Sequence, residues 1–181
     1  MPITKGFRAL VDEAMAEVKT YTVPEVLAML DDPKVHIVDI RDVRELKDGT
    51  VTGSTHAPRC MLEFWVDPES PYHKPMWADE SKHFILFCGA GWRSALATKT
   101  LQDMGMTNVA HIDGGFAEWV KQGGPVETLE ERKAKKGLMA VPVVDCPCGR
   151  CDAAAVPCPM RSAVAATSTI LTARRRPMPR R

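Results

Sequence analysis

The sequence predicts an α/β fold with a central, mainly parallel sheet flanked by helices. Three short runs, 35–40, 83–87 and 109–112, are mostly apolar and rich in β-branched or aromatic residues, a pattern typical of strands covered on both faces. Stretches with apolar residues at helical spacing lie between them. Strands that alternate with helices pair in parallel, because each helix returns the chain across one face of the sheet.

The first predicted element is an amphipathic helix that packs on the body of the protein as an N-terminal extension. Its apolar residues recur at helical spacing: Phe7, Leu10, Val11, Ala14, Met15 and Val18. A second helix begins at the capping box formed by Thr22 and Glu25 and stops at 31–33. The strand at 35–40 follows it directly.

The middle of the chain is expected to be less regular. We expect a short polar helix around 42–47, a turn at 48–53, a helix near 61–65 and then a long proline-containing loop. The strand at 83–87 leads into a cysteine- and glycine-rich loop and a helix that ends near Gly105. The strand at 109–112 precedes a last helix around 116–121.

The chain of 181 residues suits one domain with extensions. We expect an N-terminal helical extension at 1–19, a globular domain at 20–125 and a charged linker or helix at 126–137. From 138 to 181 the chain is rich in Pro, Ala, Arg and Cys, contains no aromatic residue and is expected to be disordered.

Composition predicts an ordinary cytoplasmic protein without a nucleic-acid or membrane partner. The net charge is +1, and neither a secretory signal nor a membrane-length apolar run is visible. Only two of the six cysteines, Cys60 and Cys88, fall in the globular part, which argues against a disulfide framework. The oligomeric state is left open.

Four cysteines in the tail allow a zinc interpretation, but we predict no metal site. Cys146, Cys148, Cys151 and Cys158 are closely spaced and separated by prolines that restrict wrapping around an ion. The basic end leaves two weak alternatives, contact with nucleic acid or contact with an anionic membrane. An extension with no selected function is a further alternative.

The loop Cys88-Gly89-Ala90-Gly91-Trp92-Arg93 is the strongest functional signal. Its glycines allow successive backbone N–H groups to point inward, and the helix beginning near Ser94 directs its positive dipole end at the loop. Arg93 adds a full charge. All three effects favour a thiolate at Cys88, a nucleophile at the carboxyl end of a strand, where ligands bind in such sheets.

Four motifs in order show that the chain resembles the single-domain rhodaneses, a sulfurtransferase family. They are 38–41 (Val-Asp-Ile-Arg, with Glu45 following), 49–54, the Cys88 loop, and 113–116 with Trp119, together covering about 20–125. Thr50, Thr52 and Ser54 replace His, Pro and Ala of the family pattern in a structural turn, and Cys60 stands where Gly is expected. The resemblance implies a rhodanese-like three-layer domain.

The resemblance also implies a ping-pong transfer of sulfane sulfur through a persulfide on Cys88. The donor would be thiosulfate or a similar small molecule, and the acceptor would be cyanide, a small thiol or a protein thiol. Backbone N–H groups from Gly89, Ala90 and Gly91 through Trp92 and Arg93 to Ser94 would surround the transferred sulfur. No cofactor is required.

Residues outside the loop have supporting roles in this interpretation. Arg59 is a candidate for binding an anionic donor, with a solvated surface role as the alternative. Asp39 and Arg41 are expected to orient loops through an ion pair or backbone hydrogen bonds, and Trp92 to form the rim. For Cys60 we prefer the absence of a role over attack on the persulfide, which would form a disulfide with Cys88.

Two other function classes stay open. A Cys-dependent phosphatase or arsenate reductase of related fold would need a wider Cys-x5-Arg loop, whereas Cys88 to Arg93 is Cys-x4-Arg. A non-catalytic rhodanese-like binding module is the other alternative, although inactive versions usually lack the cysteine that this chain retains.

Overall fold

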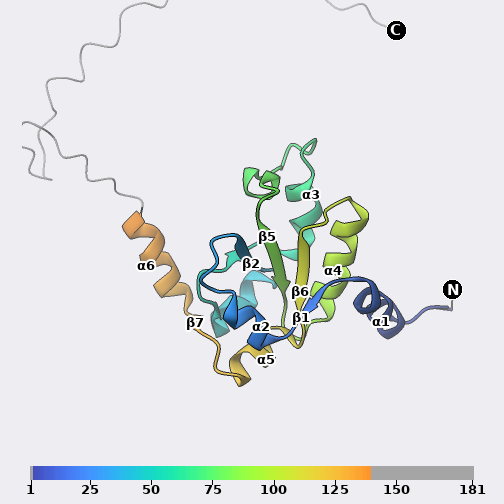
Figure 1. The fold of residues 1–181 in the computed structure, drawn as a ribbon, viewed down its shortest axis with the longest axis horizontal. Coiled ribbons are helices and arrows are strands. Elements are labelled where there is room, and N and C mark those ends of the chain that lie inside the picture. Colours follow the sequence, from blue (N-terminus) through green and yellow to red (C-terminus); the bar gives the residue numbers. More distant parts are fainter. Residues whose placement is uncertain (1, 140–181) are drawn as a thin grey trace, which may run out of the picture. The chain divides into compact units, whose positions relative to one another are not determined.

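The computed structural model describes residues 2–139, which form a parallel sheet flanked by helices (Figure 1). Five parallel strands lie in the order β1-β6-β5-β2-β4: Thr20–Tyr21, Val109–Ile112, His83–Phe87, Val35–Asp39 and Thr55–His56. A separate antiparallel pair joins β3 (Thr50–Val51) to β7 (Val126–Glu127). The predicted α/β class with a mainly parallel sheet is therefore confirmed.

The strands β2, β5 and β6 are largely buried on both faces, as their apolar sequences predict. β2 and β5 pair over their full length, from Val35 opposite His83 to Asp39 opposite Phe87. The last four residues of β5 and all four of β6 are buried. Because the strands are parallel, their carboxyl ends form one edge of the sheet, and Cys88 directly follows β5 at this edge.

Helices cover both faces and make three layers. On one face, α3 (Leu62–Val66) and α4 (Trp92–Asp103) bury Leu62, Ala97 and Leu101 against Val38 and Leu86. On the other face lie α2 (Val23–Ala28) and α5 (Gly115–Lys121), whose buried residues Val23, Val26, Phe116 and Trp119 pack against Ile37, Ile85 and Phe87. The 3-10 helix η3 (Pro75–Ala78) adds Trp77, which stacks on Phe84 at 4.7 Å.

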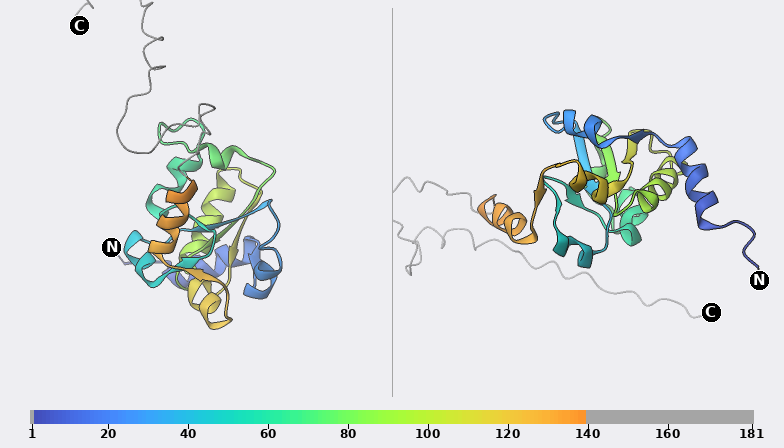
Figure 2. Two further views of the ribbon diagram at one scale, coloured as in Figure 1. Left: turned by 90° about the vertical axis from the view of Figure 1, so that its left-hand side faces the viewer. Right: turned by 90° about the horizontal axis from the view of Figure 1, so that it is seen from below.

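The N-terminal extension is the helix α1 (Phe7–Glu17), which lies beside α4 (Figures 1 and 2). Its inner face buries Val11 and Ala14, and Glu17 pairs with Lys99 of α4 at 2.6 Å. After the globular domain, the segment 126–137 contributes β7 and most of α6 (Leu129–Met139).

Several local expectations need adjustment. The short polar helix expected around 42–47 is the 3-10 helix η1 (Val43–Asp48), started by a capping box between Asp42 and Glu45. α2 ends at Ala28, earlier than expected, and α4 begins at Trp92, before Ser94. A further 3-10 turn, η2, spans Arg59–Met61. The two-residue strands β1, β3, β4 and β7 escaped prediction, since two residues carry no periodicity.

Within residues 2–139, no helix is long and apolar enough to cross a membrane. The tail from residue 140 onward, with the cysteine cluster, the basic end and the predicted disorder, lies outside the described residues.

Candidate active site

Cys88 lies at the junction between the central strand β5 and helix α4. Gly91 caps α4 with a φ of 87°, a left-handed conformation that favours glycine. The first intrahelical hydrogen bond runs from Ala95 N to Gly91 O at 3.0 Å, so the N–H groups of Trp92, Arg93 and Ser94 have no acceptor within the helix. This free positive end of α4 borders the loop that starts at Cys88.

The thiol of Cys88 is almost fully buried. Its relative exposure is 1%, and it packs with the core beside Val38 and Leu86. A donor must therefore enter the loop to bring its sulfur into contact with Cys88 Sγ.

The turn between β6 and α5 is bound to the cysteine loop by backbone hydrogen bonds. Phe116 N donates to the carbonyl oxygen of Cys88 at 2.7 Å, and Ala117 N donates to that of Gly89 at 3.0 Å. Gly115 has a φ of 58°, and a Cβ atom there would lie 2.4 Å from the Cys88 carbonyl oxygen. The Asp113-Gly114-Gly115-Phe116 motif thus acts as a backbone clamp that requires glycine at 115.

Ser94 supplies a hydroxyl group to the buried thiol. Its Oγ lies 3.7 Å from Cys88 Sγ and 2.9 Å from the carbonyl oxygen of Gly91. A hydroxyl has one proton, so these two acceptors compete for it. A thiolate would attract this proton more strongly than a neutral carbonyl does, because hydrogen bonds to charged acceptors are stronger.

Arg93 is bound by a carboxylate from another element. Its two terminal nitrogens donate to the two oxygens of Glu45 on η1, at 2.7 and 2.8 Å. The hydrogen bonds to Glu45, followed by the neighbouring Cys88, raise the pKa of Arg93, and the same pair with Arg93 lowers the pKa of Glu45. The expected full charge of Arg93 is thus partly neutralised, a partnership that the sequence pattern did not indicate.

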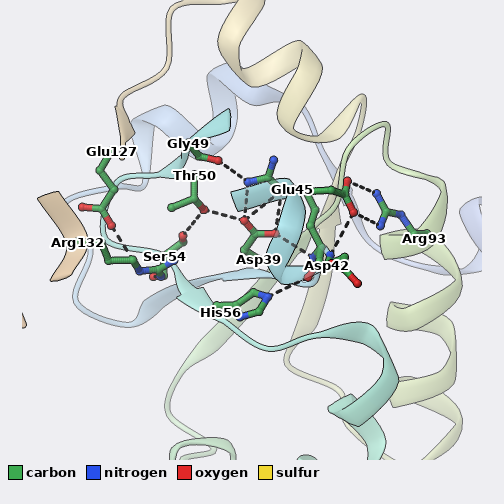
Figure 3. A network of polar contacts seen from close by, with 11 residues as sticks. Asp39, Asp42, Glu45, Gly49, Thr50, Ser54, His56, Arg93, Glu127 and Arg132 are labelled. Carbon is green, nitrogen blue, oxygen red and sulfur yellow. Dashed lines mark hydrogen bonds and ion pairs between the residues drawn. The ribbon is translucent and has the colours of Figure 1, made fainter. Parts of the chain in front are cut away.

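Asp39, the last residue of β2, forms a buried ion pair with Arg41. Asp39 lies at the centre of the polar network in Figure 3. Arg41 Nη2 donates to Asp39 Oδ2 at 2.8 Å and to the carbonyl oxygen of Gly49 at 2.7 Å. Its guanidinium also lies over the ring of Phe116, 4.0 Å from the centroid. The pair therefore joins β2, the turn before β3 and α5.

The replaced turn residues extend this buried network. Thr50 Oγ1 donates to Asp39 Oδ2 at 2.7 Å and lies 3.1 Å from Ser54 Oγ. Arg132 of α6 donates to the carbonyl oxygen of Ser54 and pairs with Glu127 (Figure 3). The segment after the globular domain thus contacts the turn that supports Asp39.

The remaining residues singled out in the sequence, Arg59, Cys60 and Trp92, are at least partly exposed. Arg59 N donates to Ile40 O at 3.1 Å, which places η2 beside the end of β2, but the Arg59 side chain is paired with Glu63. Cys60 is exposed and unbridged, and Trp92 is 47% exposed. Trp92 thus has the exposed position expected of a rim residue.

A cavity of about 870 Å³ lies at the opposite end of the sheet. It is lined by residues that precede β5 and β6, among them Trp77, Glu80, Met106 and Asn108. Since Cys88 follows the carboxyl end of β5, this cavity is separate from the cysteine loop.

The fold and the site together describe a parallel α/β domain with a buried cysteine between a central strand and the N-terminus of a helix. Residues 22–122 match the model of the rhodanese-like domain. The chain belongs to the rhodanese-like domain family.

Curated relatives include a sulfurtransferase and larger proteins. The chain is 26% identical over 113 residues to human thiosulfate:glutathione sulfurtransferase, covering 60% of this chain and 98% of the relative. It is 29% identical to rhodanese-like domain-containing protein 17 of Arabidopsis thaliana, covering 62% and 85%. A tRNA uridine(34) hydroxylase of Erwinia tasmaniensis is 33% identical over 56% of this chain, but only 29% of its own length is covered.

Solved structures agree on the fold and differ in the activities their names suggest. A Rhodopseudomonas palustris protein of unknown function, described as a possible tyrosine phosphatase, is 48% identical with a TM-score of 0.67, over 70% of this chain and 98% of its own. The human single-domain sulfurtransferase aligns with a TM-score of 0.51 at 24% identity, over 58% and 97%. This second likeness concerns the fold alone.

Proposed function

We propose that the protein is a sulfurtransferase that moves a sulfane sulfur from thiosulfate, or a similar donor, to a thiophilic acceptor through a persulfide on Cys88. The observation that carries the proposal is the placement of this cysteine, buried at the start of the α4 loop with a hydroxyl donor 3.7 Å from its sulfur. The sulfurtransferase among the curated relatives, which this chain matches over nearly all of that relative's length, supports it.

In the first half-reaction, the Cys88 thiolate attacks the outer sulfur of thiosulfate. A bond forms between Cys88 Sγ and this sulfur, the sulfur–sulfur bond of the donor breaks, and sulfite leaves with the electron pair. In the second, the acceptor attacks the outer sulfur of the persulfide, and the electron pair returns to Cys88 Sγ. The cycle is redox-neutral and needs no cofactor.

The surroundings of Cys88 favour negative charge on both sulfur atoms. The free N–H groups at the start of α4 are fixed before reaction, so they stabilise the thiolate and the persulfide anion without reorganising. The Ser94 hydroxyl adds a donor when its proton turns from the Gly91 carbonyl oxygen to the charged sulfur. Arg93 contributes a positive charge, which the ion pair with Glu45 partly neutralises. The backbone of Gly89, Ala90 and Gly91, with Trp92 at the rim, would surround the transferred sulfur.

A phosphatase is the second candidate, because the Rhodopseudomonas neighbour carries that description. The length of the loop favours sulfur. It has four residues between Cys88 and Arg93, which suits a smaller target than a phosphate group. The pairing of Arg93 with Glu45 does not separate the two candidates, because it uses two of the five N–H donors of the guanidinium.

One comparison of two activities tests this assignment. The wild-type protein should form thiocyanate from thiosulfate and cyanide, and should hydrolyse p-nitrophenyl phosphate only at background rate. C88A should lose the thiocyanate activity, while C60S should retain it. Phosphate-ester turnover that depends on Cys88, without thiocyanate formation, would replace the sulfurtransferase proposal by the phosphatase one.

A further inference from the structure

Helix α1 brings an aromatic residue and a cation to the rim of the cysteine loop. The ring of Phe7 lies 5.6 Å from that of Trp92, and the guanidinium carbon of Arg8 lies 5.5 Å from the Trp92 ring centroid and 5.6 Å from that of Phe7. Because Trp92 belongs to the Cys88 loop, the first turn of α1 is held beside the candidate active site.

The position of α1 is fixed along its length. Phe7 contacts Trp92 at the start of α4, and Glu17 pairs with Lys99 two turns later at 2.6 Å. α1 packs across α4 (Figure 2), and its buried residues Val11 and Ala14 lie between these two contacts in the sequence of the helix. This packing keeps Arg8 near Trp92.

Arg8 differs from the other arginines around the loop because its charge is not paired with a carboxylate of the described side chains. Arg41 is paired with Asp39, Arg59 with Glu63, and Arg93 with Glu45. Arg8 is exposed and has no carboxylate partner among the side chains of residues 2–135. Its contacts with Phe7 and Trp92 orient the guanidinium through the ring faces and leave its N–H donors available for an anion.

The geometry of the reaction indicates that the anion bound by Arg8 belongs to the sulfur acceptor and not to the sulfur donor. Cys88 is 1% exposed, so a small donor must enter the loop to reach it. A persulfide extends the reactive sulfur outward by about 2 Å, the length of a sulfur–sulfur bond. An acceptor thiol that attacks this outer sulfur therefore stays partly outside the loop. The parts of the acceptor that are several bonds away from its thiol then lie near the rim.

We propose that Arg8, stacked on Trp92, is a specificity-determining residue that binds a carboxylate of a low-molecular-weight thiol acceptor. The inference rests on the proposed sulfurtransferase function and names the acceptor class for the same site. The acceptor thiolate forms a bond to the outer sulfur of the persulfide, that sulfur separates from Cys88, and the Cys88 thiolate is restored. Arg8 forms no covalent bond; it orients the acceptor.

The test compares two acceptors that differ in carboxylate charge. Glutathione and its diethyl ester are used as acceptors with thiosulfate as donor, for the wild-type protein, R8Q and K5Q. K5Q is the matched control, since it removes the same charge from a neighbouring side chain that is already paired with Glu13. R8Q should raise the KM for glutathione about three- to tenfold, as expected for a partly exposed charge-assisted hydrogen bond. The KM for the ester should stay unchanged.

Further arms separate failure of this inference from failure of the proposed function. R8Q should change the KM for thiosulfate, with cyanide as acceptor, less than about twofold, because in this proposal the small donor lies inside the loop and Arg8 binds only the acceptor. R8K, which keeps the charge, should retain most of the preference for glutathione over its ester. An equal loss of thiosulfate and glutathione binding in R8Q, or an unchanged KM for glutathione, would overturn the inference. Absence of sulfur transfer to every acceptor would refute the proposed function itself.

Discussion

Glu45 and Arg93 are joined by two parallel hydrogen bonds of 2.7 and 2.8 Å, although 48 residues separate them in the sequence. The pair links η1, at the end of β2, to the first turn of α4. Glu45 also accepts a hydrogen bond from Asp42 N at 3.1 Å, so one carboxylate caps η1 and fixes the arginine. It sets both the charge and the position of Arg93 beside Cys88.

Substitution of Glu45 should slow persulfide formation. In E45Q the side chain keeps one acceptor oxygen and loses its charge, so Arg93 loses a bidentate partner and its fixed position. The second-order rate constant for sulfite release from thiosulfate should fall about five- to tenfold, a moderate effect because the pair is partly exposed. E63Q, which breaks the comparable pair with Arg59, is the control and should have a smaller effect. A faster reaction in E45Q would mean that Glu45 only reduces the useful charge of Arg93.

Removal of the Ser94 hydroxyl should make Cys88 less reactive. S94A deletes the donor that lies 3.7 Å from the sulfur, so the thiolate loses a hydrogen bond in a buried setting. The rate of alkylation of Cys88 by iodoacetamide near neutral pH should fall about three- to tenfold. Peptide mapping separates this rate from that of the exposed Cys60, which should be unaffected. Thr98→Ser, on the same helix, should leave both rates unchanged, and an unchanged Cys88 rate in S94A would exclude the hydroxyl as a thiolate donor.

Gly115→Ala should damage the site more than an equally strained substitution elsewhere. Both Gly115 and Gly53 have positive φ, 58° and 78°, so alanine costs about 1–2 kcal/mol of backbone strain at either position. At 115 the new Cβ would also lie 2.4 Å from the Cys88 carbonyl oxygen, whereas nothing lies within 4 Å at 53. G115A should therefore reduce persulfide formation about a hundredfold, as displacements of about 1 Å in a reactive centre do.

G53A is the matched control for this experiment. It should lose stability in urea unfolding and keep its rate of persulfide formation. Similar rates in G115A and G53A would show that the clamp between Phe116 and Cys88 does not position the nucleophile.

The strands and the cysteine loop were predictable because their information is local. β2, β5 and β6 are short apolar runs, and Cys88 through Ser94 is contiguous, so neither needs knowledge of distant contacts. The Thr22–Glu25 capping box was likewise predictable, and the structure contains it. Local patterns are reliable where burial on both faces or a cap determines the residue type.

Long-range polar partners were not predictable in the same way. Glu45 was visible in a motif, but nothing in its spacing relates it to Arg93, and Arg132 gives no sign of its contact with Ser54. The sequence analysis also did not identify the pairing of the Arg59 side chain with Glu63, and Arg59 stays a candidate for binding an anionic donor. The deep burial of Cys88 depends on packing from both the strand and α4, which a linear pattern does not reveal.

Stability should fall as the pH is lowered from neutrality, partly because of His111. This residue is fully buried on β6, and burial lowers its pKa below the ordinary value of about 6.5, with Asp113 opposing the shift. The folded protein therefore holds a neutral His111 where the unfolded chain binds a proton. The stabilisation is complete above about pH 6.5 and is lost as the pH falls through the lower folded pKa.

Urea unfolding between pH 8 and 5 measures this effect. H111Q should show a weaker decline of the unfolding free energy than the wild-type protein. Some decline should remain, because burial also lowers the pKa of His36 and His83. An identical decline in H111Q and the wild-type protein would remove His111 as a cause.

The most direct measurement is the intact mass of the protein after incubation with thiosulfate and removal of small molecules, with no acceptor present. We predict a product heavier by one sulfur atom, located on the Cys88 peptide, retained in C60S and absent in C88S, and lost on addition of cyanide. An unmodified wild-type protein, or added sulfur that persists in C88S, would contradict the central claim that Cys88 carries the transferred sulfur.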